Sequence, residues 1–115
     1  MNNKKINVGL IVGGASPERE VSKSSGRSIY EALKKLEYSI DIFDPGLGNH
    51  RKLEESYFSS VEDSNLISSK NYIDLFFSDS LKSVDTAFIA LHGTYGEDGK
   101  IQSLFWNYWI LEKIS

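Results

Sequence analysis

Two short apolar runs, residues 6–12 and 84–91, dominate the hydrophobic pattern of the chain. Both are rich in Val, Ile, Leu and Phe, and both run into glycine. Runs of this length and composition are typical of strands buried in a parallel sheet. Residues 38–43 instead alternate apolar and polar positions as far as Phe43, which predicts a strand less buried than the first.

A helix is predicted between the first two strands. Ser16 suits the N-cap, and Pro17 suits the first helical position because its φ is preset and it has no N–H to leave unpaired. Gly26 would permit close backbone approach to the sheet. The pattern predicts a Rossmann-like, three-layer α/β domain with an open, mostly parallel sheet. The helix would pack through an apolar stripe at helical spacing, made of Val21, Ser25, Ile29, Ala32, Leu33 and Leu36.

The rest of the chain gives weaker patterns. Short elements are expected near residues 51–57 and 70–77, because the many aromatic side chains between 46 and 83 would not sit well in solvent. A last helix is expected to start near Asp98, with the carboxylate at its N-cap.

Length and composition exclude several classes of protein. With 115 residues, the chain is expected to form one domain, residues 1–115, with a core that needs no disulfide or metal. A net charge of −3 and the lack of a basic patch argue against a nucleic-acid partner. No cysteine is present, and no run approaches the roughly 20 apolar residues of a membrane span. We therefore expect no membrane association and a cytoplasmic location.

The loops that follow the two apolar runs, residues 13–20 and 91–99, form the candidate site. Ligands of open α/β sheets bind outside the carboxyl ends of the strands, so Glu18 and His92 are expected to face one pocket. A carboxylate in the first turn of a helix is stabilised in its ionised form by about 0.3–1 kcal/mol and can bind an ammonium group. Gly13 and Gly14 let the main chain bend sharply there. These residues predict a site for a small polar ligand.

Simpler roles stay open for the same residues. Glu18 can merely complement the helix terminus, and His92 can bond a local carbonyl and order its loop. Ser22 lies about one helical turn from Glu18, although a small residue facing the sheet is the favoured interpretation. No metal site is expected, because His50 is the only other histidine and metal sites need several converging ligands.

Nucleotide-binding loops are not predicted either. The glycines at 13 and 14 do not form G-x-G-x-x-G, and Gly99-Lys100 is not followed by Ser or Thr. Neither an NAD site nor a P-loop is therefore expected.

Both loops, in their order and separation, resemble the amino-terminal domain of the D-alanine:D-alanine ligases, members of the ATP-grasp superfamily. The resemblance implies a fold of the pre-ATP-grasp type. It covers only the first third of such ligases, so their central and carboxy-terminal ATP-grasp domains are expected to be absent from this chain. The matching residues are Val12-Gly13-Gly14, Ser16, Glu18-Arg19-Glu20-Val21-Ser22, Ser25-Gly26, and the run from Phe88 to Gln102 with His92-Gly93 and Gly96-Glu97-Asp98-Gly99.

The resemblance implies a ligase for peptidoglycan precursors. ATP and magnesium activate the carboxylate of one D-alanine as an acyl phosphate, and the amine of a second D-alanine attacks it. Glu18 matches the glutamate that fixes the amino group of the first D-alanine, Val21 a residue near its methyl group, and His92 a residue beside that substrate. Arg19 and Glu20 are expected to serve salt bridges or domain contacts. The supporting positions are Gly13, Gly14, Ser22, Gly93, Glu97 (loop support) and Asp98 (capping).

No catalytic residue is expected within this chain. ATP and magnesium would be bound by the segments that it lacks and not by this domain alone, so the isolated chain is predicted to be inactive. Its expected partners are D-alanine and the remaining ligase domains, and a homodimer stays open. One alternative is a ligase that joins D-alanine to D-lactate or D-serine. Another is a non-catalytic α/β interaction module that meets a partner through Phe105, Trp106 and Trp109.

Two segments depart from the family pattern. Glu37 stands where the family commonly has a glycine that ends the first helix in the left-handed conformation. We therefore expect this helix to end by another route. Residues 109–115 replace a glycine, a proline and a final strand that ends in small residues, so the packing of this tail is open.

Overall fold

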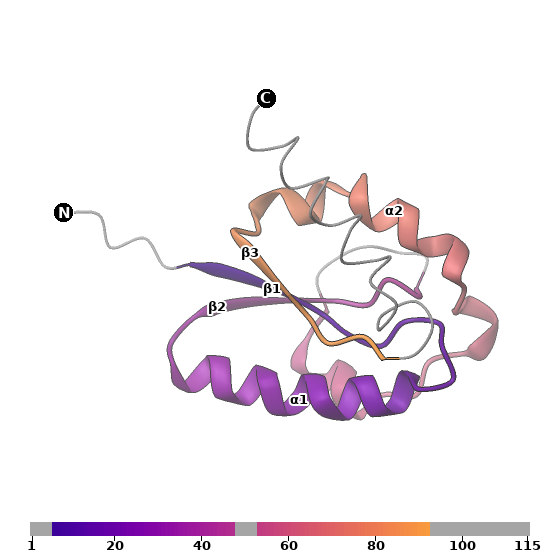
Figure 1. Cartoon of the computed structure of the whole chain (residues 1–115), viewed down its shortest axis with the longest axis horizontal. Coiled ribbons are helices and arrows are strands. Elements are labelled where there is room, and N and C mark those ends of the chain that lie inside the picture. Colours follow the sequence, from indigo (N-terminus) through magenta and orange to yellow (C-terminus); the bar gives the residue numbers. More distant parts are fainter. Residues whose placement is uncertain (1–5, 48–52, 93–115) are drawn as a thin grey trace.

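The computed structural model describes residues 6–47 and 53–92. Its strands and α-helices follow the order β1 (Asn7–Ile11), α1 (Arg19–Lys35), β2 (Ser39–Phe43), α2 (Tyr72–Phe76) and β3 (Thr86–Ile89) (Figure 1). Short 3₁₀ helices η1 (Glu55–Ser59), η2 (Ser64–Leu66), η3 (Ser69–Asn71) and η4 (Asp79–Ser83) join β2 to α2 and β3. Several predictions fall outside the described residues: the helix from Asp98, the roles of Gly93 and Glu97, the aromatics at 105, 106 and 109, and the tail 109–115.

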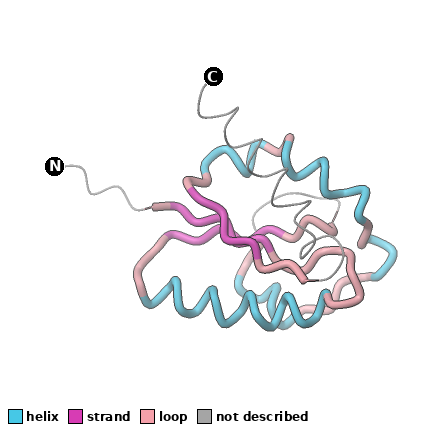
Figure 2. The backbone as a smooth tube through the Cα atoms, viewed as in Figure 1, coloured by secondary structure: helices cyan, strands magenta, loops and turns pink. Residues whose placement is uncertain are grey.

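The three strands form one parallel sheet in the order β2-β1-β3. In its register, Leu10 of β1 lies between Ile42 of β2 and Phe88 of β3. Figure 2 shows helical segments on both sides of this sheet. The predicted open α/β architecture with a parallel sheet is therefore confirmed.

Two hydrophobic clusters, one on each face of the sheet, make the fold three-layered. Neighbouring residues of a strand point to opposite faces, so Leu10 and Ile11 belong to different clusters. Leu10 packs with Tyr57 and Phe58 on the face covered by α1 and η1, whereas Ile11 packs on the face covered by α2 and η4. The second cluster consists of Ile11, Phe43, Tyr72, Leu75, Leu81, Val84 and Leu91.

Burial along the strands follows their position in the sheet. The central strand β1 is buried over four of its five residues, and β2 is buried only at its carboxyl end, as the alternating pattern predicted. The prediction of a fully buried strand within 84–91 was wrong for β3, where Thr86 and Phe88 are exposed. In the described part of the chain β3 is an edge strand, so it has fewer neighbours to cover it.

Helix α1 begins at Arg19, two residues later than the predicted first helical position at Pro17. The Arg19 amide donates to the Ser16 carbonyl at 3.1 Å, which closes a tight turn with Pro17 at its second position. Proline favours that position because its φ is fixed near the required value. Ser16 thus begins a turn, and Glu18 takes the N-cap without a capping side-chain bond.

The face of α1 that meets the sheet is not the predicted apolar stripe. Val21 and Leu36 are 54% and 67% exposed, and Ala32 is also exposed. Ile29 and Leu33 are half-buried, as expected for the stripe. The buried residues of the helix are Arg19, Ser22, Lys23 and Gly26, so polar side chains fill its first two turns.

The close approach predicted at Gly26 is confirmed. A Cβ atom there would collide with the Val12 side chain and would lie 3.5 Å from the Phe58 ring. The missing side chain therefore allows α1 to sit directly on the end of β1.

Helix α1 ends through a left-handed residue, although that residue is not glycine. Glu37 has φ 66°, the Tyr38 amide donates to the Leu33 carbonyl at 3.2 Å, and the Glu37 amide donates to the Lys34 carbonyl at 3.0 Å. These two bonds define a Schellman motif. The expectation of another route was wrong, and Glu37 adopts a backbone conformation that favours glycine.

The segment between β2 and β3 is packed much as expected. Helical elements occupy 55–59 and 69–76, and Tyr57, Phe58, Tyr72 and Leu75 are buried. The expectation that the aromatic side chains of this segment are shielded from solvent was wrong for Phe77, which is 79% exposed. Within the described residues, no helix has the length and apolar character that crossing a bilayer requires.

Candidate functional site

The candidate site lies where the three strands end and the chain leaves the sheet. The Val12 amide donates to Phe43 O at 3.0 Å and the Ala90 amide donates to Ile11 O at 2.9 Å, so the strand ends stay together beyond the last paired residues. From β1 the chain turns through Gly13 and Gly14, which have φ values of 84° and 81°. This left-handed turn directs the main chain towards α1 and needs glycine at both positions.

Three consecutive amides of this turn are bound by side chains from three different parts of the fold. Gly13 N donates to Ser22 Oγ at 2.8 Å, and Gly14 N donates to Asp44 Oδ1 at 3.0 Å. Ala15 N donates to Tyr72 Oη at 2.9 Å. Nucleotide-binding glycine loops keep such amides available for phosphate. These three amides are already engaged, which agrees with the absence of the NAD and P-loop motifs.

The side chains that hold the turn also pack tightly against it. A Cβ atom on Gly13 would collide with Asp44 and Tyr57, and one on Gly14 would lie 2.6 Å from the Tyr72 hydroxyl oxygen. Gly13 and Gly14 are themselves buried. The turn is therefore a rigid base for the residues that follow it.

Glu18 and His92 meet at this rim through Ser16. The Ser16 hydroxyl donates to the His92 carbonyl at 2.8 Å and lies 3.2 Å from Glu18 Oε2. Glu18 is exposed and His92 is half-buried. The structure thus brings the Glu18 carboxylate and the main chain of His92 to the same edge of the sheet. That the two side chains face one pocket stays a prediction.

Val21 and Ser22 lie on different sides of α1. Val21, three residues after Glu18, is more than half exposed, so the two share the outer surface of the helix. Ser22 is fully buried, and its hydroxyl donates to the Ala90 carbonyl at 2.6 Å. Ser22 therefore ties the end of β3 to the glycine turn, and the favoured interpretation of a small residue facing the sheet is confirmed.

A buried ionic cluster contacts the glycine turn through Arg19 and Asp44. It consists of Arg19 and Lys23 on α1, Asp44 after β2, and Glu62. Arg19 lies 2.7 Å from Asp44 and 2.5 Å from Glu62, and Lys23 lies 3.0 Å from Glu62. The two cations and two anions balance, which burial requires because an unpaired charge is costly away from water. The salt-bridge role predicted for Arg19 is confirmed.

The ionic cluster is also fully engaged in hydrogen bonds. Arg19 donates to the Gly14 carbonyl at 2.8 Å, and Lys23 donates to the Ser60 carbonyl at 2.7 Å and lies 4.5 Å from the centre of the Tyr57 ring. The Tyr57 hydroxyl donates to Asp44 Oδ2 at 2.6 Å. The cluster therefore connects α1, the end of β2, η1 and the glycine turn in one rigid unit.

Proton affinities in the cluster follow from burial and charge. Burial raises the pKa of Tyr57, and the negative charge of Asp44 raises it further. Burial alone would lower the pKa of Arg19, but its hydrogen bond to Asp44, the negative charge of Asp44 and the bond to Glu62 together outweigh this effect, and the pKa is raised. Burial would raise the pKa of Glu62, but bonds from Ser60, Arg19 and Lys23 lower it. Arg19 and Glu62 are thus charged near neutral pH, and Tyr57 is neutral.

Sequence reasoning missed most of these supporting residues. The sequence patterns gave no role at the site to Asp44, Lys23, Glu62 or Tyr72. One pattern pointed to them: Arg19, Ser22, Lys23 and Gly26 recur at helical spacing, which marks one face of α1. Asp44 directly follows β2, so the rule that parallel strands end at one edge could also have placed it at the same rim as the two loops.

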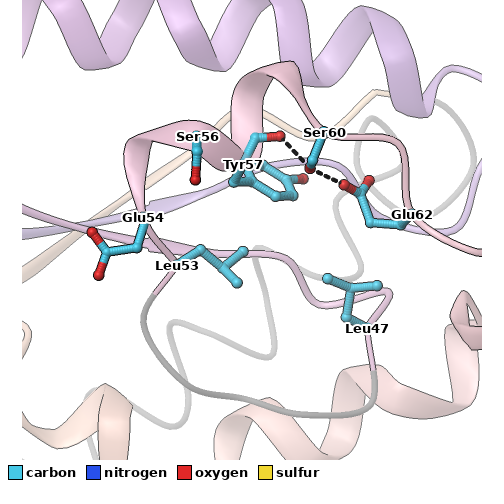
Figure 3. A pocket seen from close by; sticks show the side chains of 7 residues that line it. All are labelled: Leu47, Leu53, Glu54, Ser56, Tyr57, Ser60 and Glu62. Carbon is cyan, nitrogen blue, oxygen red and sulfur yellow. Dashed lines mark hydrogen bonds between the residues drawn. The ribbon is translucent and has the colours of Figure 1, made fainter.

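A cavity of about 510 Å³ lies beside η1 (Figure 3). Leu47, Leu53 and Tyr57 supply apolar surface, and Glu54, Ser56, Ser60 and Glu62 supply polar groups. Figure 3 shows Ser60 between Tyr57 and Glu62, bonded to the Tyr57 carbonyl and the Glu62 carboxylate. Neither Glu18 nor His92 lines this cavity, so it is distinct from the predicted recess.

The arrangement at the rim is suited to binding a cation. Glu18 presents an exposed carboxylate on a turn whose amides and glycines are fixed by buried partners. Such a carboxylate forms short, charge-assisted bonds with an ammonium group. Among the described residues, no three His, Cys, Asp or Glu side chains are grouped to hold a metal ion.

Comparison with known proteins matches this chain to one family over most of its length. The sequence model of the family described as D-ala D-ala ligase N-terminus matches residues 7–110. The D-alanine–D-alanine ligase of Thermotoga petrophila is 35% identical over 99 residues, which cover 86% of this chain and 24% of the relative. That of Ligilactobacillus salivarius is 34% identical over 119 residues, covering 91% and 31%.

A third relative, the D-alanine–D-alanine ligase of Lactobacillus acidophilus, is 39% identical over 117 residues, which cover 89% of this chain and 30% of the relative. The chain therefore spans about a quarter to a third of the length of these curated relatives. The match includes all three strands of the parallel sheet and the glycine turn. The chain belongs to the family of D-alanine:D-alanine ligase amino-terminal domains.

Proposed function

We propose that this chain is the substrate-binding domain of a D-alanine:D-alanine ligase and forms one wall of the subsite for the first D-alanine. The observation that carries the proposal is the exposed Glu18 carboxylate, which Ser16 joins to the end of β3 at His92. The family match supports it, because both residues fall within the matched range 7–110.

Each proposed role has a physical basis in the fold. Glu18 binds the substrate ammonium, because its carboxylate is exposed next to the helix N-terminus on a rigid turn. Val21 lies one turn further along the same surface and offers an apolar contact for the substrate methyl group. His92 lies at the end of β3 beside this substrate. Gly13, Gly14 and Ser22 support the turn through the contacts described above.

The complete ligase makes the D-alanyl-D-alanine dipeptide for peptidoglycan, and ATP with magnesium supplies the activation of one D-alanine carboxylate as an acyl phosphate. The three amides of the glycine turn are engaged by side chains, and among the described residues no three His, Cys, Asp or Glu side chains are grouped to hold a metal ion. We propose the remaining ligase domains as the partners of this chain. Those domains determine whether the second substrate is D-alanine or, in the alternative ligases, D-lactate or D-serine.

A consequence is that the 115-residue chain alone has no ligase activity. A coupled assay of ADP release with D-alanine and magnesium-ATP measures this. The rate should equal that of a protein-free control, and turnover by the purified chain would refute the proposed division of labour between domains.

Substrate recognition itself can be tested with two ligands that differ in one group. D-Alanine and D-lactate share the carboxylate and the methyl group, but D-lactate has a hydroxyl where D-alanine has an ammonium. In two-dimensional ¹H–¹⁵N spectra of the chain, D-alanine should shift the amides around Glu18, Val21 and His92, and D-lactate should shift them far less. Equal responses to both ligands, or shifts elsewhere only, would reject recognition of the ammonium by Glu18.

A further inference from the structure

We infer that Ser16 is a positioning residue that sets the Glu18 carboxylate relative to the carboxyl end of β3. Ser16 was expected to be the N-cap of the first helix, but Glu18 takes that position in the structure. The inference rests on the proposed function in one respect: the effect on ligand binding requires that Glu18 binds D-alanine.

The Ser16 hydroxyl has three neighbours at hydrogen-bond distance. It lies 2.8 Å from the His92 carbonyl oxygen and 3.2 Å from Glu18 Oε2, and it accepts the Glu18 amide at 3.1 Å. A hydroxyl has one hydrogen to donate, so the carbonyl and the carboxylate share it. The contact uses one of the two carboxylate oxygens of Glu18, so the carboxylate keeps further acceptor sites for a ligand.

Ser16 also stands on a rigid base, which a positioning role requires. Ser16 is 7% exposed, and its carbonyl accepts the Arg19 amide at 3.1 Å. The amide of the preceding residue, Ala15, donates to the Tyr72 hydroxyl. The hydroxyl therefore has a fixed place between β3 and the start of α1. Glu18, by contrast, is an exposed side chain with several rotamers open to it.

This arrangement gives Ser16 a defined effect. Contact with the fixed hydroxyl narrows the rotamers of Glu18, so less side-chain freedom remains to be lost when a ligand binds. The bond to His92 also keeps the end of β3 at a constant distance from the carboxylate. Without the hydroxyl, Glu18 keeps its charge but loses its preferred orientation.

The test compares Ser16→Ala with Ser16→Thr and with a matched control elsewhere. Thr keeps the hydroxyl, whereas Ala removes it. Ser68→Ala is the control, because the Ser68 hydroxyl accepts an amide two residues ahead at 3.1 Å, as Ser16 does, in a different part of the fold. If Ser16→Ala does not fold, Ser16→Cys is measured in its place, because a thiol fills the site but forms only weak hydrogen bonds.

Two measurements are made on each folded chain. Without ligand, three-bond couplings report the χ1 distribution of Glu18, and the ¹³C signal of the His92 carbonyl reports its hydrogen bond. D-Alanine is then titrated to obtain Kd. We expect Ser16→Ala to broaden the χ1 distribution, shift the His92 carbonyl signal and raise Kd about three- to tenfold, which corresponds to the net contribution of one ordinary hydrogen bond. Ser16→Thr and Ser68→Ala should stay within about twofold of the original chain.

The outcomes separate this inference from the proposed function. If the original chain binds D-alanine and Ser16→Ala binds it equally well with unchanged Glu18 couplings, the positioning role is wrong. If the original chain does not bind D-alanine but Ser16→Ala still alters the Glu18 couplings and the His92 signal, the positioning stands and the proposed function fails. If Ser68→Ala weakens binding as much as Ser16→Ala does, the effect of Ser16 is one of general stability, and the inference is overturned.

Discussion

The Arg19 guanidinium lies 2.7 Å from the Asp44 carboxylate, and the two side chains are 10% and 0% exposed. Both side chains also form hydrogen bonds with Gly14: Arg19 donates to the Gly14 carbonyl, and Asp44 accepts a hydrogen bond from the Gly14 amide. This pair fixes the glycine turn to the end of β2. Breaking one side of a buried ion pair leaves the other charge uncompensated, so the pair is a sensitive point of the fold.

Replacing Asp44 with Ala should therefore be strongly destabilising. The variant leaves Arg19 and Lys23 with Glu62 as the one anion of the cluster, so one buried positive charge is not balanced. It also removes the acceptor of the Gly14 and Gly46 amides and of the Tyr57 hydroxyl. We expect the free energy of unfolding to fall by about 3–5 kcal/mol, as for other broken buried pairs. Urea denaturation followed by circular dichroism measures the change.

Glu55→Ala is the matched control for that experiment. Glu55 pairs with Lys34 at 3.3 Å on the surface, where both side chains are more than half exposed. Solvent screens such pairs, so the urea midpoint should hardly move. Equal effects of the two substitutions would contradict the special role of the ionic cluster.

Acid should weaken the fold partly through Glu62. Its bonds to Ser60, Arg19 and Lys23 outweigh the effect of burial and lower its pKa below the ordinary value of 4.5. A lowered folded-state pKa contributes stability above the unfolded-state pKa, and that stability is lost as the pH falls through the folded-state pKa. Glu62→Gln should thus be less stable than the original chain at pH 7, and the difference should shrink below about pH 4.5. Urea midpoints at pH 7, 5 and 3 test this, and a gap that stays constant over that range would argue against the ion pairing of Glu62.

Substituting Glu37 with Gly should stabilise the chain. Glu37 has φ 66° at the end of α1, a conformation that glycine adopts without a steric penalty from Cβ. We expect a gain of about 0.5–1 kcal/mol in the free energy of unfolding. Glu37→Ala is the control, because alanine keeps the penalty and should give no gain. An alanine variant as stable as the glycine variant would show that φ is not the cause.

The glycine turn should not tolerate a side chain at residue 14. Gly14→Ala places a Cβ 2.6 Å from the Tyr72 hydroxyl and keeps φ at 81°, so it combines a clash with backbone strain. Tyr72→Phe removes that hydroxyl and the clash but leaves the strain. We expect the loss in thermal stability caused by Gly14→Ala to be smaller in the Tyr72→Phe background than in the original one. An equal loss in both backgrounds would exclude the Tyr72 contact as a cause.

The sequence predicted those parts of the fold that depend on local pattern. The apolar run before Gly13 and the alternation before Phe43 located β1 and β2 to within one or two residues. Parallel strands present their carboxyl ends at one edge, and this rule placed Glu18 and His92 at the same rim. These predictions succeeded because each needed only neighbouring residues and a general rule of topology.

Predictions failed where distant residues decide the outcome. Arg19 and Lys23 face inward only because Asp44 and Glu62 arrive from other segments to balance them. The amphipathic pattern of α1 contains no information about those partners, so it favoured Val21 and Leu36 as buried. Glu37 shows the same limit: the Schellman bonds override the intrinsic preference of a glutamate against the left-handed conformation.

The most direct test of the central claim is the Kd of D-alanine for the chain carrying Glu18→Gln, measured beside Glu20→Gln. Glu20 is an exposed acid in the first turn of the same helix, so it controls for a change of net charge near the site. Loss of the carboxylate charge should raise Kd at least about tenfold in Glu18→Gln, since a charge-assisted bond is lost, and Glu20→Gln should stay within about twofold. An unchanged Kd in Glu18→Gln, or equal effects of the two substitutions, would contradict the assignment of Glu18 as the group that binds the substrate ammonium.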